Sequence, residues 1–158
     1  MHIRLAAMLI LLLAALAPAA VAADAPQREA DIGVVVGEPL GFTGKIWFDD
    51  WFAADFGAGI DEGNAGFWAD ALWHNWTLLP QPQAGRLAAY VGVGPQLRAG
   101  GDARFGIRAI VGAAFRPTAY PVELYAEAGP LFEFTQGGWL DAAGGVGVRY
   151  RFDAAPLK

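Results

Sequence analysis

Apolar and polar positions alternate along most of this 158-residue chain. The alternation is clearest near the C-terminal end, in W-L-D-A-A-G-G-V-G-V-R-Y-R-F at 139–152. From Leu140 onward, even-numbered positions are apolar or aromatic, and the odd-numbered ones carry Asp141, Arg149, Arg151 and small residues. Side chains on a strand point alternately to its two faces. The stretch therefore predicts a strand with one apolar face and one charged, glycine-rich face.

Seven further stretches show the same alternation. With 139–152, the predicted strands are 32–36, 40–48, 51–60, 66–76, 86–98, 103–115, 122–134 and 139–152. Turn-forming residues such as Asp61-Glu62-Gly63-Asn64 separate consecutive strands, and the longest connection is 77–85. A helical period is absent and glycine is frequent, which argues against helices. We predict an all-β fold, an eight-stranded antiparallel up-and-down β-barrel.

Two prolines lie inside the predicted strands. Pro95 and Pro130 each follow a glycine, and each removes a backbone donor from the hydrogen-bond ladder. A β-bulge is one feature that absorbs such a proline in a strand.

The N-terminal segment has the features of an export signal. His2 and Arg4 precede a short apolar run, which ends in small residues around Ala22 and Ala23. We predict cleavage after one of these two alanines. The chain then divides into a signal peptide (1–23), a flexible leader (24–30), a barrel (31–152) and a C-terminal tail (153–158).

The composition bears on what surrounds the barrel. Hydrophobic residues make up 55% of the chain and charged residues 17%. Within the predicted strands, the apolar face holds no charged residue. In a membrane barrel that face meets lipid, whereas in a soluble barrel it would form the core. We predict a transmembrane barrel, and a soluble periplasmic lipid-binding barrel remains the alternative.

The charged face would then line a narrow interior. Buried charges persist when they are paired and hydrogen-bonded, so we predict a salt-bridge network that plugs the lumen. A narrow pore or a small-ligand carrier is the alternative. The predicted members are Lys45, Asp55, Asp70, Arg98, Arg104, Arg108, Glu123, Glu127, Asp141, Arg149 and Arg151.

The chain as a whole resembles the small eight-stranded outer-membrane barrels of Gram-negative bacteria. Its ending, G-V-R-Y-R-F, is similar to their assembly signal, with Gly147, Tyr150 and Phe152 at the signature positions. The segments G-E-P-L-G-F-T-G-K-I-W-F and A-D-A-L-W-H-N are similar to an uncharacterised family of such barrels. The resemblance implies location in the outer membrane, contact with its lipid, and recognition by its assembly machinery during biogenesis.

Candidate chemistry is sparse. His74 is the one histidine after the predicted signal, and the chain has neither serine nor cysteine. A lipid-modifying enzyme would need His74 with a partner group, and a structural role is the simpler interpretation. We predict no catalytic residue, no metal site and no cofactor. The formal net charge of −5 without a basic cluster argues against nucleic acid, and we expect a monomer.

Overall fold

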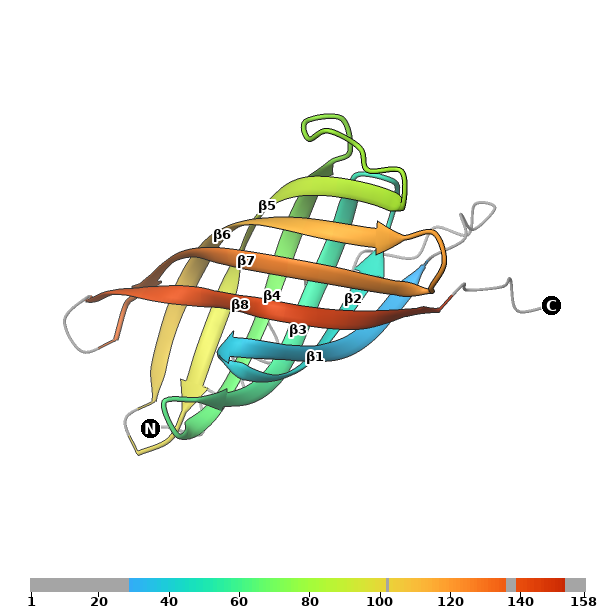
Figure 1. The fold of residues 1–158 in the computed structure, drawn as a ribbon. Helices are drawn as coiled ribbons and strands as arrows, with labels where there is room; N and C mark the ends of the chain where they lie inside the picture. The colour runs from blue at the N-terminus through green and yellow to red at the C-terminus, as the bar shows by residue number, and fades with distance from the viewer. Residues whose placement is uncertain (1–28, 102, 136–138, 153–158) are drawn as a thin grey trace, which may run out of the picture.

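The protein folds as a closed antiparallel β-barrel. The computed structural model describes residues 29–101, 103–135 and 139–152. Each strand pairs with its neighbours in sequence, and β1 also pairs with β8, which closes the sheet (Figure 1). The predicted eight-stranded, all-β, up-and-down architecture is confirmed. The strands are β1 (Ala30–Glu38), β2 (Leu40–Trp47), β3 (Phe52–Asp61), β4 (Asn64–Asn75), β5 (Gly85–Ala99), β6 (Arg104–Pro117), β7 (Val122–Glu133) and β8 (Trp139–Phe152).

The strand limits differ from the predicted ones by no more than two residues. β1 begins at Ala30, inside the segment predicted as leader, because Ala30 pairs with both Ile46 and Phe152. The predicted signal peptide, its cleavage site, most of the leader and the tail lie outside the described residues.

The two ends of the barrel hold different connections between strands, and both described chain ends lie at one of them. The start of β1, the end of β8 and the connections after β2, β4 and β6 lie at one end, which we call the terminal end (Figure 1). The other four connections lie at the hairpin end. There Glu62 and Gly63 have φ of 46° and 79°, as a tight two-residue turn between Asp61 and Asn64 requires.

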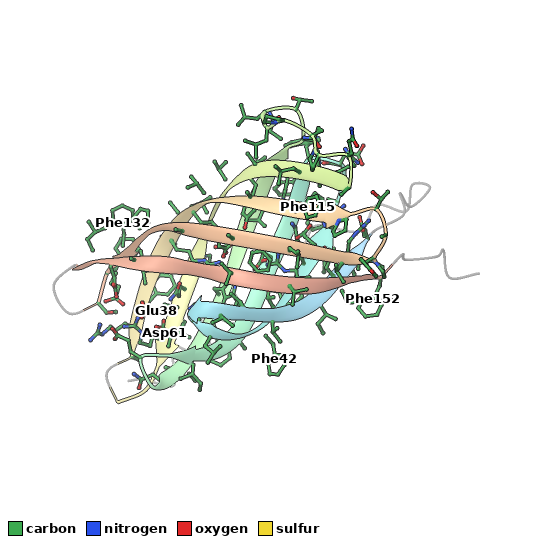
Figure 2. All side chains as sticks on the ribbon, viewed as in Figure 1. Glu38, Phe42, Asp61, Phe115, Phe132 and Phe152 are labelled. Carbon is green, nitrogen blue, oxygen red and sulfur yellow. The ribbon has the colours of Figure 1, made fainter. Side chains whose placement is uncertain are left out.

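Apolar side chains cover the outside of the barrel and polar ones fill its inside. Phe42 is 71% exposed and Val111 is 63% exposed, and every strand contributes exposed large hydrophobic residues. Phe42, Phe132 and Phe152 point away from the barrel wall (Figure 2). Glu38, the last residue of β1, is the one charged residue on the outward face of the strands. No helix among the described residues is long and apolar enough to cross a membrane.

The two strand prolines are accommodated without bulges. The β4–β5 register is the same on both sides of Pro95, but the pairs that would involve Ala69 and Asp70 are missing. On its other edge β5 remains paired, with Pro95 opposite Ile107. Pro130 in β7 shows the same arrangement. Its pairs with β6 are missing, and on the other edge it remains paired with Ala142 of β8. Neither proline lies at a bulge: each faces a short interruption in a single ladder.

Candidate functional site

The barrel interior concentrates the charges of the chain. Its charged residues come from all strands and meet in four groups along the barrel axis. The buried members are Asp31, Lys45, Asp55, Asp61, Asp70, Arg98, Arg108, Glu123, Glu133 and Arg149.

Arg149 links β8 to three other strands inside the barrel. From β8 it forms ion pairs with Asp55 of β3 and with Glu123 of β7, the latter at 3.2 Å. It also donates to the hydroxyl of Thr43 at 2.9 Å. Its guanidinium lies 3.7 Å from the ring centroid of Tyr125. Because the Arg149 side chain is 1% exposed, these contacts replace the water that it would otherwise bind.

Lys45 connects this group to His74. Its Nζ atom donates to Glu123 Oε1 and to His74 Nε2, both at 2.9 Å. The imidazole packs between the rings of Trp47 and Tyr90, with centroids 4.3 and 5.0 Å away. His74 Nδ1 is buried and has no hydrogen-bond partner among the described residues. Glu123 bonds to Lys45 and not to the His74 imidazole. It therefore does not orient His74 as the acid of a catalytic triad orients its histidine.

A second group lies between β4, β6 and β7. Arg108 forms ion pairs with Asp70 and with Glu127, the latter at 3.1 Å. Tyr90 donates to the other Glu127 oxygen at 2.6 Å. The Trp68 ring lies 5.5 Å from the Arg108 guanidinium. Arg108 therefore has acceptors and an aromatic surface on several sides.

At the hairpin end, Arg98 is surrounded by carboxylates. It pairs with Asp61 at 3.0 Å and Glu62 at 2.9 Å, and lies 3.6 Å from Glu133 and 3.8 Å from Asp141. Gln96 adds a hydrogen bond to Asp61 at 2.9 Å. These contacts join β3, β5, β7 and β8 directly below the hairpin turns.

At the terminal end, Arg116 has the central position. It bonds to Glu29 at 3.1 Å and Glu123 at 3.0 Å, and lies 3.8 Å from Asp31. Glu29 also pairs with Arg151. The residue before β1 thus ties β6 to the end of β8.

The residues expected to form the lumen network all lie on the inward face, and each has at least one ion pair. They belong to the four groups, and Glu123 links the Arg149 group to the Arg116 group. Arg104, Asp141 and Arg151 lie near the barrel ends, where their side chains are 34%, 29% and 24% exposed.

Sequence reasoning missed further members of the network: Glu29, Asp31, Asp61 and Arg116. Glu29 lies in the predicted leader, and Asp61 and Arg116 lie in predicted turn segments. Alternation would have found Asp31 and Asp61, because both continue the inward positions of β1 and β3. It also indicates the interior aromatics Trp47, Trp68, Tyr90 and Tyr125, which pack beside the charges.

Among the described residues, no group of three or more His, Asp or Glu side chains has a geometry that could hold a metal ion. The carboxylates are instead engaged by arginine and lysine.

No family model and no curated protein matches the chain. Among solved structures, it is similar to the N-terminal β-barrel domain of Pseudomonas aeruginosa OprF, with 18% sequence identity and a TM-score of 0.45. The alignment covers 80% of this chain and 98% of that domain.

Proposed function

We propose that this protein is a small outer-membrane β-barrel with a structural or interaction role, whose lumen is closed by its charged side chains. One observation carries the proposal. The barrel is inverted relative to a soluble one, with large apolar residues outside and paired charges inside.

This arrangement matches the requirements of a bilayer. Soluble monomers rarely expose contiguous apolar patches beyond a few hundred Å², whereas here every strand presents apolar side chains outward. In lipid those side chains are favourably placed. The closed sheet also leaves no unpaired strand edge, which hydrocarbon would not tolerate.

The finer assignment to the Gram-negative outer membrane draws on the C-terminal strand. Tyr150 and Phe152 are each 49% exposed and face outward, with ring centroids 4.9 Å apart. A Cβ atom on Gly147 would lie 2.4 Å from the Tyr125 ring, so a larger residue would clash there. We propose that these three residues form the signal read by the assembly machinery, in a member of the uncharacterised barrel family that the sequence resembles. Export would precede cleavage after Ala22 or Ala23.

Closure of the lumen follows from the size of the interior and its contents. An eight-stranded barrel has an interior just wide enough for side chains. Here large side chains such as Arg108, Arg149 and Trp68 occupy it, and Arg108 and Arg149 bond to carboxylates of non-neighbouring strands. We propose that no continuous water path remains for ions.

The test is gel mobility of the membrane-extracted protein in SDS, unheated and boiled, together with cell fractionation. We expect a heat-dependent mobility shift and recovery in the outer-membrane fraction. A protein that purifies without detergent and shows no shift would support the soluble lipid-binding barrel and overturn the proposal.

Conductance in planar bilayers tests the closed lumen separately. We expect no steady single-channel current from the wild-type barrel. A steady current from a preparation that shows the mobility shift would favour the narrow pore over the closed barrel.

A further inference from the structure

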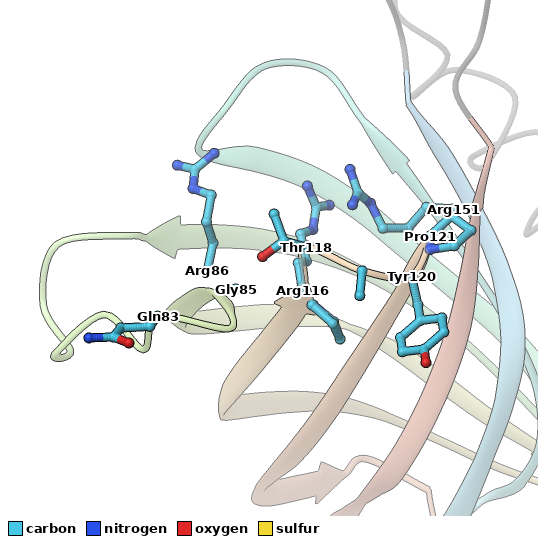
Figure 3. Close-up of a pocket in the computed structure, with 10 residues that line it drawn as sticks. Gln83, Gly85, Arg86, Arg116, Thr118, Tyr120, Pro121 and Arg151 are labelled. Atoms are coloured by element: carbon cyan, nitrogen blue, oxygen red, sulfur yellow. The ribbon is translucent and has the colours of Figure 1, made fainter.

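A cleft at the terminal end has features of a ligand site. It has a volume of about 640 Å³, within the range of small-molecule pockets. The β6–β7 turn forms one wall, and the start of β5 and the end of β8 contribute the others (Figure 3). Three arginines line it, namely Arg86, Arg116 and Arg151, together with Thr118 and Tyr120.

Hydrogen bonds fix the walls of this cleft. The backbone N–H and the hydroxyl of Thr118 both donate to the carbonyl oxygen of Ala84, at 2.9 and 3.0 Å. The N–H of Arg151 donates to the carbonyl oxygen of Pro121 at 2.9 Å. The β6–β7 turn is therefore tied to β5 on one side and to β8 on the other, so the cleft exists before any ligand arrives.

The charges of the cleft are unevenly compensated. Glu29 bonds to both Arg116 and Arg151 and does not line the cleft. Arg86 has no carboxylate partner among the described residues. It lies against the Trp76 ring, 4.5 Å from its centroid, with its side chain exposed. Because a guanidinium presents several donors in one plane, Arg86 has donors free for an incoming anion.

We infer that this cleft binds a phosphate-bearing anion. Arginine forms paired hydrogen bonds with phosphate oxygens, and Arg86 and Arg151 would contact the anion from two sides of the cleft. The Glu29 carboxylate between Arg116 and Arg151 shows that this end of the barrel already holds an oxyanion between two guanidinium groups.

The source of the phosphate rests on the proposed function. In an outer-membrane barrel whose chain termini face the periplasm, the terminal end lies at the headgroups of the inner leaflet. Tyr120 is 67% exposed beside the cleft, as is typical of an aromatic residue at a membrane interface. The headgroup of an anionic phospholipid would then reach the cleft from the adjacent bilayer, and free phosphate would reach it from solution.

Titration calorimetry on the detergent-solubilised barrel tests the inference with three probes. They are dihexanoyl-phosphatidylglycerol, the zwitterionic dihexanoyl-phosphatidylcholine and inorganic phosphate. We expect the phosphatidylglycerol to bind more tightly than the phosphatidylcholine. Arg86→Gln should weaken binding about tenfold, since hydrogen bonds to charged groups contribute on that order. The Arg86→Gln/Arg151→Gln double variant should abolish it.

Arg104→Gln is the matched control, because Arg104 is a partly exposed arginine at the opposite end of the barrel. It should bind all probes as the wild type does. Tight binding of inorganic phosphate would identify a soluble anion as a sufficient ligand, and preference for phosphatidylglycerol alone would identify the lipid headgroup. Either result supports anion binding in the cleft, provided that the arginine variants lose this binding.

The inference is overturned if Arg86→Gln and the double variant bind as the wild type does. It is also overturned if the two lipids bind equally and phosphate does not bind. The gel-mobility shift of each preparation is recorded first. A preparation with the shift but without binding contradicts the anion site alone. A preparation without the mobility shift contradicts the membrane barrel. The titration with inorganic phosphate then still decides whether the cleft binds an anion.

Discussion

At the scale of single residues, the buried arginines depend on how completely they are paired. Arg149 bonds to residues of β2, β3 and β7 and stacks on Tyr125, so one side chain crosses much of the interior. Taking such a charge out of water is costly, and the ion pairs offset that cost only while both partners are present. Removing one partner leaves the others buried and less compensated.

Arg149→Met tests this dependence. The variant leaves Asp55 and Glu123 inside the barrel without their shared guanidinium. We expect the free energy of unfolding to fall by about 3–5 kcal/mol, as for other buried pairs that lose one partner. Urea unfolding of the barrel in lipid vesicles, followed by tryptophan fluorescence, measures the change.

Arg104→Met is the control for that experiment, because the Arg104 side chain is 34% exposed and solvent screens its ion pairs. Its effect should stay below about 1 kcal/mol. Equal effects of the two substitutions would mean that the interior is wet and that Arg149 is not desolvated.

At the scale of strands, two Gly-Pro pairs set the local geometry of the wall. A Cβ atom on Gly94 would lie 1.8 Å from the carbonyl oxygen of Ala69, and one on Gly129 equally close to that of Ala109. In both places the neighbouring strand approaches the glycine backbone, and the following proline has no N–H to offer the ladder. The sequence shows the two dipeptides, but their fit depends on the adjacent strand.

Gly94→Ala should therefore destabilise the barrel. The methyl group must displace the Ala69 backbone or the Asp70 carboxylate, which lies 2.6 Å from its position. We expect a loss of about 1–3 kcal/mol in unfolding free energy, as in other overpacked sites. The urea midpoint of the variant in vesicles measures it.

Gly101→Ala provides the comparison, because nothing lies within 4 Å of a Cβ atom at that position. It should leave the midpoint unchanged. If the two alanine variants unfold alike, the close approach at Gly94 is not a constraint on the strand.

At the scale of the whole molecule, the direction of the two faces decides where the barrel can reside. A barrel whose outward face meets hydrocarbon penalises a charge near the middle of a strand and tolerates it near the strand ends. A barrel in water would tolerate an outward charge at either position. Val93 and Glu38 offer this contrast, because both point outward, one at mid-strand in β5 and the other at the end of β1.

Val93→Arg should lower the unfolding free energy in lipid vesicles by about 2–4 kcal/mol, the cost of an arginine near the bilayer midplane. Glu38→Arg should change it by no more than about 1 kcal/mol. Parallel urea titrations of both variants and the wild type give the comparison. Equal tolerance of the two arginines would contradict the lipid-facing assignment.

The sequence by itself determined the strands and their faces, because side-chain direction on a strand has a period of two and depends only on local order. The number of strands, the outward apolar residues and the inward charges all follow from that period. Only the tertiary structure decided which charges meet. Arg149 reaches Thr43 and Asp55 because the sheet closes between β8 and β1, and Arg98 meets Asp61 because strand registers bring their ends together. Register and closure are set by interactions between strands distant in sequence, which local alternation does not encode.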